Sequence, residues 1–219
     1  KLGFNQIPKA IVFDWDNTLV DSWSVIADAI NYTLKSLGHD IWSLDQVKKQ
    51  ARYSLRDSFP DLFGNEWKQA TDVFYERYKK MHTSLIKPIA GVSSMLIELN
   101  ENNICLCVVS NKRGDLLRIE ADRLGWSNHF KKIVGANDAK KDKPSIEPIK
   151  LALNNVLSLE TNNIWFIGDT DIDMECGYNA NCVPILMRQN DIEDNEFLNF
   201  KPVAHFRDSH ALCRWIRTL

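Results

Sequence analysis

Residues 10–19 read AIVFDWDNTL, a short apolar run that leads directly into two aspartates, an asparagine and a threonine. An apolar run of this length predicts a strand that is buried on both faces, as in a parallel sheet. An ionised Asp14 at the end of such a strand is costly unless a cation or hydrogen bonds compensate its charge. The stretch therefore predicts a parallel sheet with a polar site at the carboxyl end of its first strand.

Similar apolar runs recur along the chain and alternate with helical patterns. Further strands are expected at residues 104–109, 132–134, 164–167 and 183–187. Apolar residues spaced three and four apart predict helices at residues 93–101, 115–124 and 146–154. This alternation predicts an α/β fold with a Rossmann-like parallel sheet core and right-handed crossovers.

One long stretch breaks the alternation, because residues 22–86 contain no convincing strand pattern. Helices are expected at residues 22–37, which stop at Gly38, and at residues 67–85, with shorter helical pieces between them. We therefore expect an all-helical domain, residues 22–88, inserted into an α/β core domain that comprises residues 1–21 and 89–219.

Composition excludes several classes of protein. The 219 residues include 27 Lys and Arg and 29 Asp and Glu, a net charge of −2, which argues against a dedicated nucleic-acid binder. The longest apolar run, residues 104–109, is too short to span a membrane. Five cysteines without a C-x-x-C pair argue against a disulfide framework or a zinc site. We expect a cytoplasmic protein without a membrane partner; composition does not indicate its oligomeric state.

Two further polar clusters follow predicted strands. Ser110-Asn111 follows the second strand, where a hydroxyl and backbone amides can bind phosphate oxygens. Lys143-Pro144 precedes a predicted helix, where a positioned ammonium can hold a phosphoryl group and an anionic nucleophile. Each cluster alone is weak, since Ser-Asn after a strand is commonly a turn and a lysine-rich run is commonly a solvated surface.

The most acidic cluster is Gly168-Asp169-Thr170-Asp171-Ile172-Asp173, directly after the strand expected at 164–167. Three carboxylates in five residues repel one another unless a cation gathers them, and Mg²⁺ prefers oxygen ligands. Asp169 and Asp173 are four residues apart, so an early helical turn can place both on one face.

In the first cluster, Asp14 and Asp16 can divide their work between attack and proton transfer, although a strand-end turn also accounts for them.

In this order and spacing, the four clusters resemble those of the haloacid dehalogenase-like (HAD) hydrolase superfamily, and the resemblance covers nearly the whole chain. The helical insert after the first cluster resembles the α-helical cap of that family. Residues 16–22 and 55–59 resemble the phosphoglycolate phosphatase-type branch. The resemblance implies a Mg²⁺-dependent phosphatase that hydrolyses a small phosphomonoester, with 2-phosphoglycolate as the candidate, through a phosphoaspartyl intermediate.

The resemblance also implies roles for individual residues. Asp14 would be the nucleophile, Asp16 the general acid and base, and Lys143 the cation that offsets the charge of the reacting groups. The phosphoryl oxygens would be held by Thr18, Ser110 and Asn111. The Mg²⁺ ligands would be Asp14, the backbone carbonyl of Asp16, Asp169 and, through water, Asp173.

Within the expected cap, Arg52, Tyr53 and Arg56 are candidates for binding a substrate carboxylate, since the arginine fork suits such a group. Surface arginines on a helix would give the same pattern. In the first motif, Asn17 replaces the more usual glycine of the family, and asparagine tolerates the positive φ that a turn requires there.

Two alternatives to a phosphatase remain open from the sequence. A β-phosphoglucomutase-like sugar phosphomutase would use the same residues and transfer the phosphoryl group to a second hydroxyl. A non-catalytic binding or scaffold protein on this fold could dispense with Asp14, Asp16, Lys143 or Asp169, all of which are present. A haloacid dehalogenase needs neither Asp16 nor the acidic motif, and both are present here.

Overall fold

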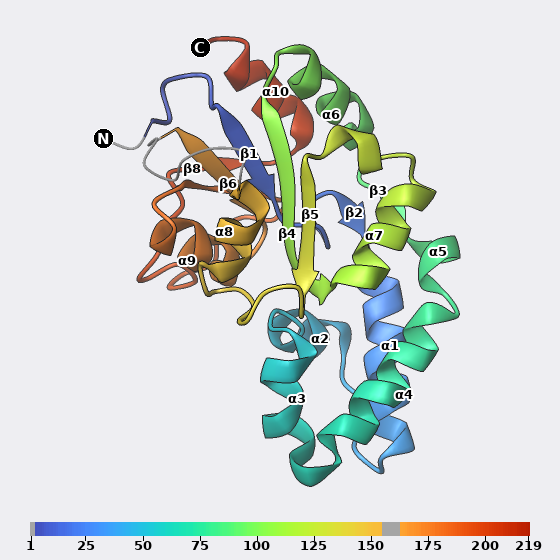
Figure 1. Ribbon diagram of the computed structural model, residues 1–219. Helices are drawn as coiled ribbons and strands as arrows, with labels where there is room; N and C mark the ends of the chain where they lie inside the picture. Colours follow the sequence, from blue (N-terminus) through green and yellow to red (C-terminus); the bar gives the residue numbers. More distant parts are fainter. Residues whose placement is uncertain (1–2, 155–162) are drawn as a thin grey trace.

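A computed structural model describes residues 3–154 and 163–219 of the chain (Figure 1). In this part of the chain, six strands form one sheet in the order β5-β4-β1-β6-β7-β8, and each neighbouring pair is parallel. The strands are β1 (Ala10–Phe13), β4 (Cys105–Arg113), β5 (Lys132–Ala136), β6 (Ile164–Gly168), β7 (Val183–Met187) and β8 (Ala204–Phe206). The predicted parallel α/β sheet is confirmed.

The central strand β1 brings the carboxyl ends of its two neighbours to one level. Phe13 lies opposite Val108 of β4 and opposite Ile167 of β6. The residues that follow these positions therefore meet at one edge of the sheet, on either side of the point where the strand order reverses. Ligands of open α/β sheets bind at this place.

Helices cover both faces of the sheet, which explains the unbroken apolar strands. Ile11 and Phe13 join the larger apolar cluster with residues of α6 (Val92–Glu101), α7 (Gly114–Arg123) and α10 (Ser209–Ile216). Ala10 and Val12 join a second cluster with residues of α8 (Glu147–Leu153) and α9 (Asp171–Asn179). Because successive strand residues point to opposite faces, a strand covered twice must be apolar throughout.

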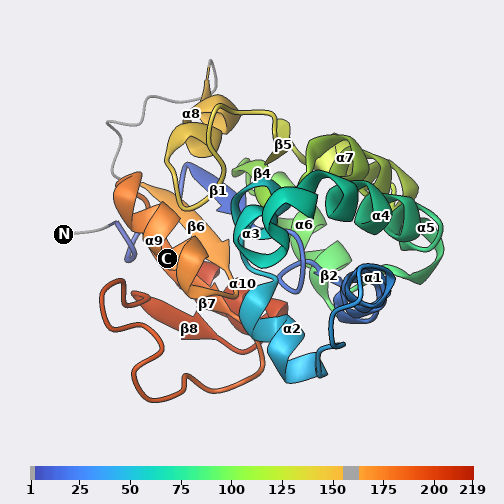
Figure 2. The same cartoon turned by 90° about the horizontal axis from the view of Figure 1, so that it is seen from below.

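A group of five helices leaves the sheet after β1 and returns before α6. It lies between two short strands, β2 (Val20–Asp21) and β3 (Lys87–Pro88), which pair antiparallel. Its helices are α1 (Trp23–Ser36), α2 (Leu44–Gln50), α3 (Leu55–Phe63), α4 (Trp67–Lys79) and α5 (His82–Leu85). We call residues 22–86 the helical insert. Figures 1 and 2 show that α2 and α3 lie beyond the carboxyl ends of the central strands.

The single helix predicted over residues 67–85 is wrong. The structure has α4 and α5 there, and the chain leaves helical geometry at Met81, where φ is −124°. This break turns the ring of His82 into the interior, where Nδ1 lies 2.8 Å from Oε1 of Glu120. The interior contact outweighs the continuous helical periodicity of the sequence.

Two elements near the end of the chain have no counterpart in the prediction. The edge strand β8 has three half-buried residues, too few to show a period. Helix α10 begins after Asp208, whose side chain accepts a hydrogen bond from the Ala211 amide. No helix in the described ranges combines the length and the apolar character needed to cross a bilayer.

Candidate active site

Asp14 and Lys143 are in direct contact at the carboxyl edge of the sheet. Asp14 follows β1, and its backbone amide donates to the carbonyl oxygen of Ile167 at the end of β6 (2.8 Å). The Lys143 ammonium, 3% exposed, donates to Asp14 Oδ1 and to Asp173 Oδ1, both at 2.7 Å. The lysine therefore joins the first motif to the acidic motif, although it is distant from both in sequence.

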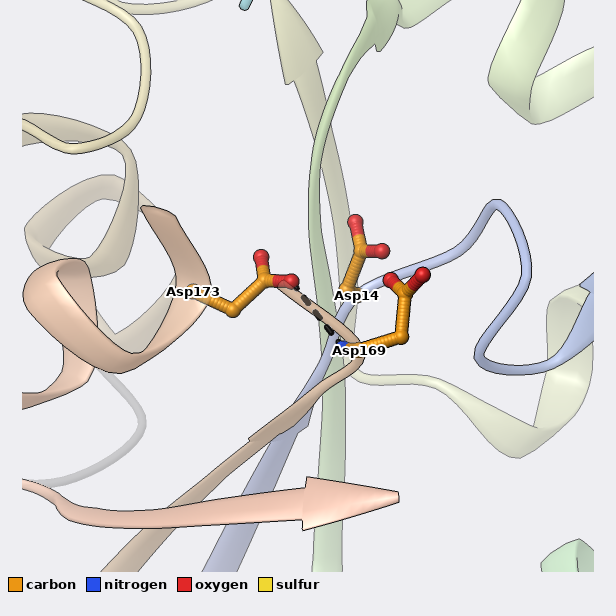
Figure 3. A group of neighbouring side chains, drawn as sticks. All are labelled: Asp14, Asp169 and Asp173. Carbon is orange, nitrogen blue, oxygen red and sulfur yellow. Dashed lines mark hydrogen bonds between the residues drawn. The ribbon is translucent and has the colours of Figure 1, made fainter. Parts of the chain in front are cut away.

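Three carboxylates converge around this contact. Asp14, Asp169 and Asp173 are all buried, and each offers an oxygen within 4.8 Å of the other two (Figure 3). Burial raises the pKa of Asp14 to about 6; the charge of Asp173 adds to this rise, and Lys143 opposes it. Burial, followed by the charges of Asp14 and Asp173, holds the pKa of Asp169 well above its usual range. The cluster therefore carries more negative charge than its surroundings stabilise.

The donor set of this cluster suits a hard divalent cation. Lys143 bonds Asp14 and Asp173, whereas the carboxylate of Asp169 accepts a hydrogen bond from the Thr18 hydroxyl (3.2 Å). One ammonium against three carboxylates leaves negative charge that a cation would offset, and all the available donors are oxygens, as Mg²⁺ prefers. The residues present fit the predicted Mg²⁺.

Asp173 also holds the loop between β6 and α9. Its Oδ2 accepts hydrogen bonds from the amides of Asp169 (3.1 Å) and Thr170 (3.0 Å) and from the Thr170 hydroxyl (2.9 Å). Figure 3 shows the first of these bonds. With Oδ1 bonded to Lys143, both oxygens of Asp173 have protein partners. This arrangement suits a residue that orients Asp169 and Lys143 while contacting a cation through water.

Ser110 and Asn111 lie where β4 changes its register against β5, between Val109 and Arg113. Such irregularities turn side chains toward a site at the end of a strand. Asn111 exchanges hydrogen bonds with the backbone of Lys143, since its Oδ1 accepts from the Lys143 amide (3.0 Å) and its Nδ2 donates to the Lys143 carbonyl (3.1 Å). Asn111 therefore positions the lysine. Ser110 is buried, and its hydroxyl accepts from the Lys112 amide.

The turn after Asp14 has the backbone shape that its sequence suggests. Asn17 has a φ of 62°, so the predicted left-handed conformation is confirmed. Thr18 is buried, and its hydroxyl lies 3.4 Å from Asp14 Oδ2 as well as 3.2 Å from Asp169. The threonine thus contacts both carboxylates.

A second lysine, which the sequence analysis did not single out, contacts Asp16. The ammonium of Lys112 is nearly buried and lies 2.6 Å from Asp16 Oδ1 and 2.6 Å from Oε2 of Glu120. Burial lowers the pKa of Lys112, but the charges of Asp16 and Glu120 outweigh it, so that the pKa lies above its usual value. The one feature of the sequence that points to Lys112 is its position directly after Ser110-Asn111.

Glu120 is the buried centre of that contact. Besides Lys112, it accepts hydrogen bonds from the Trp15 indole (2.8 Å) and the Tyr78 hydroxyl (2.9 Å), and it contacts His82. Burial alone would raise its pKa, but Lys112, His82 and Trp15 together lower it. Its position four residues after Leu116, on the apolar face of α7, could have revealed it, because an ionised residue on such a face needs partners.

The three candidate substrate contacts of the helical insert, Arg52, Tyr53 and Arg56, have different surroundings in the structure. Arg56 makes two 2.6 Å hydrogen bonds to the buried carboxylate of Asp142. Arg52 donates to Asp171 (2.6 Å) and lines the cavity of the site, as does Tyr53, which is 48% exposed. Both arginines therefore connect the helical insert to the loops of the sheet.

A single cavity of about 810 Å³ joins the carboxylate cluster to the helical insert. Its sheet end is lined by residues that follow β1 and β6, by residues near the end of β4 and by the Lys143 loop, namely Asp14, Asp16, Ser110, Asn111, Lys143, Asp169 and Asp173. Its other end is lined largely by aromatic and aliphatic side chains of α1, α3 and α4. A ligand at the carboxylates would therefore extend toward the insert.

Comparison with known proteins places this geometry in a family. The sequence profile of the haloacid dehalogenase-like hydrolases matches residues 11–187. A phosphoglycolate phosphatase of Aquifex aeolicus is 34% identical over 176 residues, 78% of this chain and 81% of its own length. The Pyrophosphatase PpaX of Oceanobacillus iheyensis is 25% identical over 194 residues, 89% of this chain and 90% of its own length.

Solved structures share the fold. A hydrolase of the haloacid dehalogenase-like family from Streptococcus pneumoniae superimposes with a TM-score of 0.82 at 22% identity, covering 94% of this chain and 97% of its own. The match extends over the sheet and the helical insert together, because it spans nearly all of both chains.

Proposed function

The chain belongs to the haloacid dehalogenase-like hydrolase family, and on that premise we propose that it is a Mg²⁺-dependent phosphatase that forms a phosphoaspartyl intermediate on Asp14. The observation that carries this proposal is the placement of the Lys143 ammonium between Asp14 and Asp173, beside Asp169, in a buried cluster at the carboxyl edge of the sheet. An anionic nucleophile and an anionic phosphate approach each other only where cations offset their repulsion.

In the first step, Asp14 attacks the phosphorus of the substrate. A bond forms between a carboxylate oxygen and phosphorus, and the bond from phosphorus to the ester oxygen breaks. Asp16 lines the same cavity and contacts Lys112 through Oδ1, and a proton held on its other oxygen, Oδ2, would pass to the departing alkoxide. The Ser110 hydroxyl would hold a phosphoryl oxygen directly. Asn111 and Thr18 would do so by exchanging their bonds to the Lys143 backbone and to the carboxylates for bonds to phosphate, and the ammonium of Lys143 would offset the charge.

In the second step, water cleaves the aspartyl phosphate. Asp16, now ionised, takes a proton from the attacking water, the bond from phosphorus to Asp14 breaks, and inorganic phosphate leaves. Lys112 orients Asp16 through both steps, because it contacts Asp16 Oδ1 at 2.6 Å while Glu120 holds the lysine from the other side.

Mg²⁺ would be held by Asp14, the backbone carbonyl of Asp16 and Asp169, with Asp173 acting through water. When bound, it would supply a Lewis acid that offsets the charge of the phosphoryl group. The raised pKa values of Asp14 and Asp169 support this assignment, since a cation would stabilise the ionised form of both.

The helical insert, together with the two residues of β3 that follow it, would act as a lid on a separate core. We divide the chain into a catalytic core, residues 1–21 and 89–219, and a lid, residues 22–88, joined by the paired strands β2 and β3. A lid over the carboxyl edge would exclude water from the first step and select the leaving group.

Five unbridged cysteines support a cytoplasmic setting, where a small phosphorylated metabolite would be the partner.

The test is Mg²⁺-dependent release of phosphate from p-nitrophenyl phosphate and from a panel of phosphorylated metabolites. The panel includes 2-phosphoglycolate, because a relative carries that substrate in its name. We expect Asp14→Asn to abolish turnover, whereas Asp72→Asn, an exposed aspartate of α4, serves as the matched control.

Acid-quenched enzyme should carry covalent phosphate in the wild type and none in Asp14→Asn. If the protein hydrolyses no compound on the panel, that result would contradict the proposal and favour a non-catalytic scaffold protein. Isomerised sugar phosphate instead of free sugar from β-glucose 1-phosphate would show a mutase.

A further inference from the structure

The cavity is larger than the leaving group of a two-carbon phosphoester requires. Its volume of about 810 Å³ lies in the upper part of the range, about 300–1,000 Å³, in which proteins bind drug-sized ligands. The phosphoryl group would occupy only the end at Asp14 and Lys143. The remainder extends between α1, α3 and α4, so the shape of the site leaves room for a substantial leaving group.

The charges that line the cavity do not favour a second negative group. Of the described residues that line it, every lysine and arginine already contacts a carboxylate of the protein. These pairs are Arg52 with Asp171, Lys112 with Asp16 and Glu120, Arg113 with Asp115, and Lys143 with Asp14 and Asp173. Of these, only Lys143 contacts the carboxylate cluster that would receive the phosphoryl group. A carboxylate or second phosphate at the insert end would find no unpaired cation among the described residues that line the cavity.

Aromatic side chains form much of the insert end. Phe59, Phe74 and Tyr78 pack on one another, so their rings belong to the core of the insert. Trp42 and Tyr53 also line the cavity, and in residues 3–154 and 163–219 neither ring stacks on another aromatic ring. Tyr53 is 48% exposed. An exposed aromatic face in a cavity provides a stacking surface for a planar ring.

Hydrogen-bond acceptors of the helical insert also line the cavity. Asp57, Asp61 and Gln50 line the same end of the cavity, and all three are exposed. Carboxylates accept hydrogen bonds from N–H and O–H groups and repel anions. The insert end therefore combines stacking surfaces with acceptors, and the part of its lining that the structure describes holds no unpaired positive charge.

We propose that the substrate is a phosphomonoester whose leaving group is uncharged and carries a planar aromatic ring with hydrogen-bond donors, as in a nucleoside 5′-monophosphate. This proposal rests on the phosphatase function proposed above and names the substrate class of that site. The ring would lie against Tyr53 and Trp42, and its donors would face Asp57 and Asp61.

The test compares kcat/KM, at saturating Mg²⁺, on three groups of phosphomonoesters. The first contains uridine and adenosine 5′-monophosphates, the second contains pyridoxal 5′-phosphate and p-nitrophenyl phosphate, and the third contains the acyclic 2-phosphoglycolate and glycerol 3-phosphate. We expect the first group to exceed the third by about tenfold or more, the selectivity that one stacked base provides. Preference for the second group over the first would support the ring and reject the nucleoside.

Variants of Tyr53 test the stacking surface. Tyr53→Ala should lower the ratio of kcat/KM between nucleoside and acyclic substrates by about fivefold or more, and Tyr53→Phe, which keeps the ring, should restore it. The matched control is Tyr32→Ala, a tyrosine of α1 that is 49% exposed and does not line the cavity. Circular dichroism of each variant checks that the insert remains folded.

The outcomes separate this inference from the proposed function. A higher kcat/KM on acyclic substrates than on every ring-bearing one would overturn the inference and leave the phosphatase intact. An equal change of the ratio in Tyr53→Ala and Tyr32→Ala would overturn the role of Tyr53 in stacking. Turnover of no compound would overturn both proposals.

Discussion

The ammonium of Lys112 lies 2.6 Å from the carboxylate of Asp16, and this contact ties the end of β4 to the loop that follows β1. The same ammonium contacts Glu120, which is 1% exposed and receives further hydrogen bonds from Trp15 and Tyr78. Tyr78 belongs to the helical insert, so a single buried carboxylate connects the proposed proton donor, the sheet and the insert. This connection leads to the first two predictions.

Replacing Lys112 by methionine should destabilise the protein strongly. The substitution leaves Glu120 buried without its cation, and breaking a buried ion pair from one side costs about 3–5 kcal/mol. Urea unfolding measures the change in the free energy of unfolding. Lys80→Met is the control, because Lys80 pairs with Glu76 at the surface, where such a pair is worth about 1 kcal/mol or less. Equal losses in the two variants would contradict the importance of the buried contact.

Glu120 should make stability depend on pH in the acid range. Its pKa in the folded protein lies below the ordinary value of 4.5, because Lys112, His82 and Trp15 outweigh the opposing effect of burial. The unfolded chain therefore takes up the proton first as the pH falls. The stabilisation is complete above about pH 4.5 and is lost as the pH falls through the folded pKa.

In Glu120→Gln this part of the acid dependence should disappear. Urea unfolding at a series of pH values from neutral to acid should show a shallower decline than in the wild type, from a lower starting stability. Parallel declines in the two proteins would show that Glu120 titrates alike in the folded and unfolded states.

Magnesium should raise the melting temperature of the wild-type protein. A bound Mg²⁺ would offset the repulsion among Asp14, Asp169 and Asp173, and these carboxylates are gathered only in the folded state. A ligand at a concentration of about 100 times its Kd raises the Tm of a chain of this size by about 5–10 °C. Differential scanning fluorimetry with and without a chelator measures the shift. Asp169→Asn should lose most of it, while Asp72→Asn, an exposed aspartate of α4 that does not line the cavity, should keep it. The same shift in both variants would place the cation elsewhere.

Arg56 should hold the helical insert against the sheet loops. Its two 2.6 Å hydrogen bonds reach the buried carboxylate of Asp142, and a third reaches the carbonyl of Ala139. In Arg56→Gln we expect faster hydrogen exchange of the amides of α2 and α3. Arg77→Gln is the control, because Arg77 pairs with Asp28 inside the insert and not across to the sheet. Unchanged exchange in Arg56→Gln would show that other contacts hold the insert.

Local patterns were sufficient for much of the fold and for the motifs of the site. The apolar runs predicted five of the six sheet strands, because a strand covered on both faces must be apolar along its length. Asp14, Asp169 and Lys143 could be singled out since each follows or precedes a predicted element where its charge needs a partner. The edge strand β8 and the break at Met81 could not be predicted, because neither leaves a local period.

The sequence by itself determined which chemical groups stand at the ends of the strands, since that follows from the order of apolar and polar residues along the chain. Only the tertiary structure decided which charges neutralise one another. Lys112 and Glu120, eight residues apart, contact each other. Two other parts of the chain supply their further partners, since Lys112 also contacts Asp16 and Glu120 also contacts Tyr78. Arg56 contacts Asp142, which is 86 residues away. Burial makes an unpaired charge costly, so these pairs form wherever the packed elements bring opposite charges together, and no local pattern specifies them.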